Sequence, residues 1–110
     1  MGSAQSYSNN DYELVIKTSK ELEHLLDFEF HATGKGLHEK VSSVHDQLPD
    51  SLCKRMRFLA TIRNKLIHER GFDKIPDRAG FISAFEESKC ELTKILESRN
   101  SKAHSSCVIS

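Results

Sequence analysis

The sequence predicts an all-α domain, a four-helix, mostly antiparallel up-down bundle with a flexible tail at each end. Three observations predict this fold class. Four segments repeat their apolar residues at spacings of three and four, which is the period of an amphipathic helix. Glycine or proline separates each segment from the next, and no segment shows a convincing strand pattern. Helices that are apolar on one side must bury those sides against one another.

The first helix is expected to begin near Asp11, after a small and polar segment, residues 1–10, that should be flexible. Its apolar side is formed by Leu14, Val15, Leu22, Leu25, Leu26 and Phe30. Gly34 and Gly36 should end this pattern, because two glycines in three residues are costly inside a helix.

The second helix is shorter, and its stripe consists of Leu37, Val41, Val44 and Leu48. Pro49 should end it, and Asp50 is a good N-cap for the third helix. The third stripe consists of Leu52, Met56, Leu59, Ile62 and Leu66. We expect this helix to stop at Gly71, since glycine readily adopts the left-handed conformation of a helix C-cap.

The fourth helix should follow Pro76 and Asp77. Its stripe consists of Phe81, Phe85, Leu92, Ile95 and Leu96. The polar composition of residues 98–110 predicts a flexible C-terminal tail. The bundle is therefore expected to occupy residues 11–97.

Length and composition limit the class of protein. The 110 residues suffice for one domain, and 37% hydrophobic with 29% charged residues fits a soluble helical protein. A formal net charge of zero gives no global attraction to nucleic acid or anionic lipid. The sequence shows no apolar run of about 20 residues for a membrane span and no secretory signal. Three cysteines without paired spacing indicate reduced thiols, so we expect a cytoplasmic protein. We also expect no metal and no cofactor.

The run from Arg63 to His68 carries the chemistry of this chain. Arg63 can bind two phosphate oxygens at once and keeps its charge. His68 belongs to the residue type that exchanges protons near neutral pH. Asn64 adds an amide beside the arginine, one turn before His68. A fixed cation beside an imidazole is the minimum equipment for metal-free phosphodiester chemistry.

Residues 54–70, which contain this run, are the most basic part of a neutral chain. A local basic patch is what a phosphate-backbone ligand requires. The candidate RNA-binding residues of this patch are Lys54, Arg57, Lys65 and Arg70.

The run Arg63-Asn64-Lys65-Leu66-Ile67-His68 resembles the Arg-x4-6-His motif of the HEPN superfamily, whose members are small all-helical domains common in bacteria. In that family a polar residue, often asparagine, follows the arginine, and the motif lies in the third main helix. The resemblance covers roughly residues 11–97, and its specific part is the motif and the helix order.

The resemblance implies a metal-independent endoribonuclease. Arg63 would bind the scissile phosphate, His68 would act as general base or acid, and Asn64 would orient His68 or hold the phosphate. The products would carry a 2′,3′-cyclic phosphate and a 5′-hydroxyl. The resemblance also implies a homodimer with RNA as substrate and no DNA, in a toxin or defence setting with an antitoxin or regulatory protein as a further partner.

Two alternatives belong to other classes. The superfamily includes non-catalytic modules that bind a protein, nucleotide or RNA through the same cleft. The chain could also be a lipid-anchored adaptor, since Cys107 lies where C-terminal prenylation occurs and Gly2 fits the N-myristoylation pattern. The thin basic content near Cys107 argues against a membrane partner.

Two further patterns favour ordinary structure. His24, His31, His38 and His45 recur every seven residues, but the glycines at 34 and 36 interrupt the helix that would align them. His31 and His38 flank this loop and could line a cleft. Lys35 lies between the glycines in what resembles a simple interhelical turn more than a phosphate-binding loop.

Overall fold

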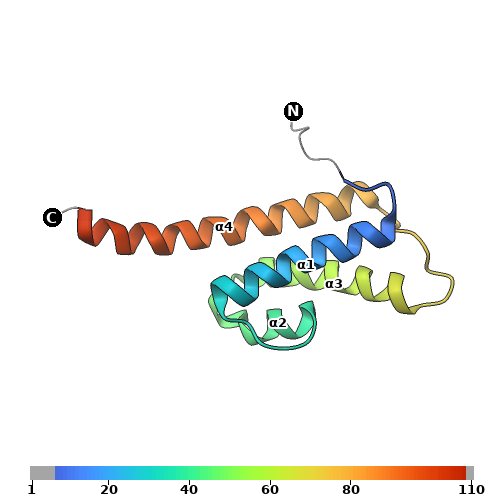
Figure 1. Ribbon diagram of the computed structural model, residues 1–110, viewed down its shortest axis with the longest axis horizontal. Helices are drawn as coiled ribbons and strands as arrows, with labels where there is room; N and C mark the ends of the chain where they lie inside the picture. Colours follow the sequence, from blue (N-terminus) through green and yellow to red (C-terminus); the bar gives the residue numbers. More distant parts are fainter. Residues whose placement is uncertain (1–6, 109–110) are drawn as a thin grey trace.

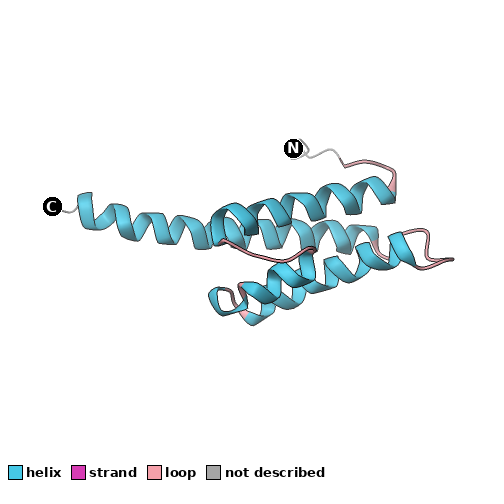
Figure 2. Ribbon diagram, turned by 60° about the horizontal axis from the view of Figure 1, so that its bottom comes forward, coloured by secondary structure: helices cyan, strands magenta, loops and turns pink. Residues whose placement is uncertain are grey.

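The computed structural model describes residues 7–108, with side chains for residues 7–100 (Figure 1). Its α-helices are α1 (Asp11–Phe30), α2 (Leu37–Ser43), α3 (Asp50–His68) and α4 (Arg78–Val108). A short 3-10 helix, η1 (His45–Gln47), lies between α2 and α3. Within the described range there is no strand, and loops alone join the helices (Figure 2). The prediction of an all-α four-helix bundle is confirmed.

The long helices α1, α3 and α4 pack against one another, and the short α2 packs against α1 and α3. α3 runs opposite to both α1 and α4, as the chain colours in Figure 1 show. The loop after α1 leads back along the bundle before α2 begins. This return places the start of α2 beside the middle of the bundle.

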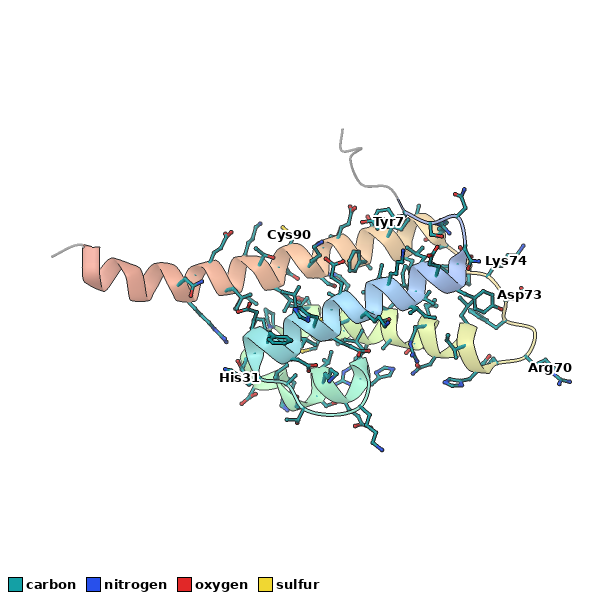
Figure 3. All side chains as sticks on the ribbon, in the orientation of Figure 1. Tyr7, His31, Arg70, Asp73, Lys74 and Cys90 are labelled. Carbon is teal, nitrogen blue, oxygen red and sulfur yellow. The ribbon has the colours of Figure 1, made fainter. Side chains whose placement is uncertain are left out.

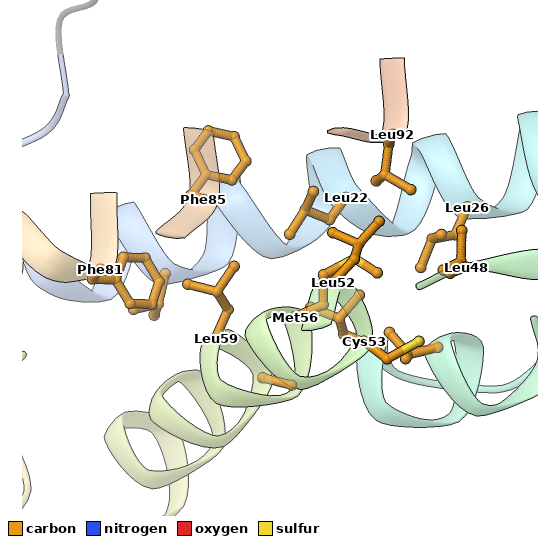
Figure 4. Close-up of a cluster of buried hydrophobic side chains, with 14 of the residues drawn as sticks. Leu22, Leu26, Leu48, Leu52, Cys53, Met56, Leu59, Phe81, Phe85 and Leu92 are labelled. Carbon is orange, nitrogen blue, oxygen red and sulfur yellow. The ribbon is translucent and has the colours of Figure 1, made fainter. Parts of the chain in front are cut away.

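The core lies between the apolar sides of these helices (Figure 4). Leu22 from α1, Leu52 from α3 and Leu92 from α4 are each 0% exposed. Burial of one such side chain stabilises the fold by about 1.5–3 kcal/mol. Most residues of the four predicted stripes are buried, so helical period alone identified most of the core.

The end of α1 follows from left-handed backbone. α1 ends at Phe30, and the next residue, His31, has φ 60°. Gly34, in the same loop, has φ 120°. Gly71 has φ 88° and turns the chain, but the prediction that α3 stops there was wrong. The helix ends at His68, and its C-cap Glu69 has extended backbone.

Three further predicted boundaries were wrong. Pro49 is the N-cap of α3 and Asp50 is its first residue, since Pro49 already has the extended ψ of 147° that precedes a helix. α2 ends at Ser43, and its last predicted turn is replaced by η1. α4 continues to Val108 instead of ending near residue 97. Neither glycine nor proline occurs after Gly80, so nothing in the backbone stops this helix.

The last residues of the segment predicted to be flexible are held against α4. The Tyr7 hydroxyl donates a 2.6 Å hydrogen bond to Glu86, and Arg78 donates to the Ser8 carbonyl and pairs with Asp11. The Asp11 carboxylate also accepts from the Ile75 amide at 2.8 Å. These contacts fix the start of α1 to the start of α4. None of the helices in the described residues is long and apolar enough to span a membrane.

Candidate functional site around Arg63

Arg63 lies on the packed side of α3. It follows Leu59 by four residues and precedes Leu66 by three, and these leucines are 1% and 2% exposed. Residues at this spacing share one face of a helix. The Arg63 side chain is half-buried, and its Nε atom is buried without a hydrogen-bond partner among the described residues. Its Nη1 donates a 3.0 Å hydrogen bond to Oδ1 of Asn64.

A pocket of about 240 Å³ opens where Arg63 leaves the core. α1 contributes Glu23, α3 contributes Ala60, Arg63 and Asn64, and the start of α2 with its preceding loop supplies the rest. The lining residues from that last part are Lys35, Gly36, Leu37, His38 and Glu39. The pocket thus combines an arginine, an amide, a lysine, an imidazole and carboxylates.

Burial changes the protonation of two groups in this pocket. It raises the pKa of the Glu23 carboxyl, although Lys40 and Arg63 act to lower it. Burial also lowers the pKa of the His38 imidazole, and the charge of Arg57 lowers it further. A desolvated charged form is disfavoured, so both groups tend toward their neutral states.

His68 lies outside this pocket. It is exposed, and α3 remains regular to its end, since the Glu69 amide donates to the Lys65 carbonyl at 2.9 Å. Five residues of regular helix turn His68 about 140° away from Arg63. An irregular last turn could bring the two closer, but the regular helix shows no such turn. The structure therefore brings Arg63 and Asn64 together and leaves His68 of the same chain apart.

The predicted RNA-binding residues are also divided. Lys54 and Lys65 are exposed on one side of α3, separated by about three turns, with Phe58 between them at 44% exposure. Arg57 turns toward α2 and donates a 2.9 Å hydrogen bond to Ser42. Arg70 is exposed in the α3–α4 loop, at the end of the bundle opposite to His31 (Figure 3).

Sequence reasoning missed the role of Glu23, because nothing in its neighbourhood distinguishes it from other helix-surface acids. His38 and Lys35 were noticed, but their distance in sequence from Arg63 hid their shared pocket. The spacing of Leu59, Arg63 and Leu66 was the available signal that the arginine faces inward.

Other features lie away from this pocket. A larger hollow of about 460 Å³ lies along α4, and none of the predicted site residues lines it. No group of three or more His, Cys, Asp or Glu side chains in the described part of the chain is placed to hold a metal ion. Gly2 and the side chain of Cys107, the candidate lipidation sites, lie outside the described residues.

Comparisons of the chain with protein-family models, curated proteins and solved structures found no match. The class defined by fold and site is an all-α bundle whose third helix presents an arginine and an asparagine to a small polar pocket.

Proposed function

We propose that this protein is a metal-independent endoribonuclease of the HEPN type, in which Arg63 binds the scissile phosphate of RNA. The observation that carries the proposal is the Arg63 guanidinium, which lines the pocket but forms no ion pair among the described residues. Arg55 and Arg78, by contrast, are each paired with carboxylates. Among the described residues no carboxylate is in direct contact with this partly dehydrated charge, and Glu23 acts on it only from a distance. Such a charge favours an anion from outside the chain.

His68 would complete this site from a second copy of the chain. Within one chain, regular helix geometry separates it from Arg63 by about 140°. A symmetric homodimer is the commonest way to bring one surface of a protein to another. In this proposal His68 of one copy reaches the phosphate bound by Arg63 of the other, and exposed Lys54 and Lys65 attract the RNA backbone.

The test is RNA cleavage by the purified protein in EDTA, beside Arg63→Ala and His68→Ala variants. We expect products with 2′,3′-cyclic phosphate and 5′-hydroxyl ends, and loss of cleavage in both variants. Arg99→Ala is the matched control, because Arg99 lies on α4, where it contacts Gln47 and the Phe30 ring, and does not line the pocket. Absence of cleavage by the folded wild-type protein over a broad set of RNAs would refute the nuclease.

The second candidate is a non-catalytic module that binds RNA, a nucleotide or an acidic protein segment. The favouring observation is that Arg63 and Asn64 are hydrogen-bonded to each other and line one pocket, which His68 of the same chain does not line. For this module, His68→Ala should leave affinity unchanged while Arg63→Ala weakens it. A toxin or defence role with an antitoxin partner remains part of the nuclease proposal only.

A further inference from the structure

The pocket around Arg63 contains a histidine that belongs to no part of the Arg63–His68 motif. His38 is the second residue of α2 and lines the same pocket of about 240 Å³ as Arg63 and Asn64. It also borders a shallower neighbouring hollow, together with Ser42 and Glu39. It therefore has access to solvent on one side and to the arginine pocket on the other.

Local contacts hold the His38 ring in place. Its Nε2 atom lies 3.3 Å from the Thr61 hydroxyl on α3. Lys40, two residues later, contacts Asp27 at 2.8 Å and the Gly34 carbonyl at 3.0 Å, which ties α2 and its loop to α1. The imidazole thus stands on a short helix that is tied to both walls of the pocket, which is the rigidity a proton-transfer group needs.

We propose that His38 is the general base of the Arg63 pocket. This inference rests on the proposed ribonuclease function. The neutral imidazole takes the proton of the ribose 2′-hydroxyl, whose oxygen then forms a bond to phosphorus. The bond from phosphorus to the 5′ oxygen breaks, and that oxygen takes a proton from protonated His68 of the second copy. Water returns the two imidazoles to their starting forms, so the reaction is a transesterification with no other reactant.

The charges around His38 support a base that is neutral at neutral pH. The charged or titratable residues that face it from the three surrounding segments are Glu23 on α1, Lys35 and Glu39 before and on α2, and Arg57 and Arg63 on α3. Burial lowers the pKa of His38 below its ordinary value of 6.5, and Arg57 acts in the same direction. The rate should therefore rise with pH as His38 loses its proton, with a midpoint below 6.5.

The experiment measures kcat/KM against pH for a pool of end-labelled, random-sequence oligoribonucleotides in EDTA. His38→Gln should lower kcat/KM at least about a hundredfold and remove the rise with pH. Binding of the same pool with 2′-O-methyl groups, which cannot react, should be unchanged. His45→Gln is the matched control, since His45 is exposed on η1 and does not line the pocket.

The outcomes separate this inference from the proposed function. Cleavage that needs Arg63 but survives His38→Gln, or keeps its rise with pH, overturns the role of His38 and leaves the nuclease standing. No cleavage by wild-type protein overturns both. If His38→Gln fails to fold, the wild-type protein still tests the role of His38. The titration of His38 followed by NMR must then have the same midpoint as the rise of kcat/KM with pH. Different midpoints overturn the inference.

Discussion

The guanidinium of Arg63 donates a 3.0 Å hydrogen bond through Nη1 to the side-chain oxygen of Asn64, its neighbour on α3. Adjacent helix residues normally diverge by about 100°, so this bond requires the arginine to lie along the helix surface toward Asn64. The bond holds Nη1, and Nε is buried, so a ligand can meet the guanidinium only at its outer Nη atoms. Asn64 therefore sets the direction in which the charge of Arg63 faces.

Removal of the Asn64 amide should weaken the site without harming the fold. A hydrogen bond to a charged group contributes about 1.5–3 kcal/mol, so Asn64→Ala should lower kcat/KM for RNA by roughly ten- to a hundredfold. Steady-state cleavage assays in EDTA measure this change. Asn9→Ala, at an exposed position before α1, is the control. Equal activities for the two variants would contradict the role of Asn64.

The sequence allowed Arg63 and Asn64 to be selected, because their chemistry is visible in a short run. It did not allow their surroundings to be predicted, since Glu23 and His38 reach the pocket from α1 and α2 through the fold. The relation of Arg63 to His68 was the least predictable feature. Whether a helix frays at its end depends on local hydrogen bonds that residue types do not determine.

Mixing two inactive variants tests whether His68 acts across a dimer. Each mixed dimer of Arg63→Ala and His68→Ala chains keeps one site with both residues intact. Random exchange makes half of the dimers mixed, so activity should return to roughly one quarter of wild type. The recovered activity is measured as RNA cleavage by an equimolar mixture of the two variants after subunit exchange.

The control is a mixture of Arg63→Ala chains with chains that carry both substitutions, which has no intact site in any arrangement. Recovered activity in the first mixture alone supports action across the dimer. Failure of both mixtures, with exchange demonstrated by labelled chains, would place His68 outside the reaction or inside its own chain.

Gly34 and Gly36 should respond differently to the same substitution. Gly34 has φ 120°, and an added Cβ would lie 2.5 Å from the Cβ of Glu39. Gly34→Ala should therefore cost about 1–3 kcal/mol of unfolding free energy. Gly36 has φ −139° and open space around it, so Gly36→Ala should change stability by less than about 1 kcal/mol. Urea denaturation of both variants checks this, and equal losses would contradict the strain at Gly34.

These two glycines show which features of the fold could be predicted from the sequence and which could not. Two glycines in three residues predicted the break between the first two helices, and the break is there. Which glycine is indispensable depends on the approach of Glu39, which only the structure reveals. Likewise, polar composition suggested a loose tail after residue 97, but α4 continues to Val108. The residues of this segment include no glycine or proline, so they are compatible with a helix.

Lys40 should stabilise the protein more than an exposed lysine does. Its side chain is only 11% exposed and contacts the Asp27 carboxylate at 2.8 Å and the Gly34 carbonyl at 3.0 Å. Lys40→Met keeps the apolar part of the side chain but removes the ammonium group from the Asp27 carboxylate and the Gly34 carbonyl. This should lower the free energy of unfolding by about 1–3 kcal/mol. Lys17→Met is the control, because Lys17 is 72% exposed and water screens its surface pair with Glu13. Thermal unfolding should rank the two variants in this order, and a reversed order would refute the role of Lys40.

The half-buried carboxyl of Glu23 should give the stability a measurable pH dependence. Burial raises the pKa of Glu23 above its ordinary value of 4.5, so the folded protein binds more protons than the unfolded chain between 4.5 and the raised pKa. Stability must fall as pH rises through that window, and the loss is complete above the folded pKa. Glu23→Gln cannot ionise, so its stability relative to wild type should increase from pH 4 to pH 7.

Urea denaturation at intervals across this range measures the difference between Glu23→Gln and wild type. Glu29→Gln, an exposed position on the same helix, corrects for the general effect of removing one negative charge. The attraction of Arg63 and Lys40 opposes the burial of Glu23, so a flat or falling difference would mean that these cations outweigh it. In that case Arg63 would be neutralised within the chain, and its availability for phosphate, on which the proposed function depends, would be lost.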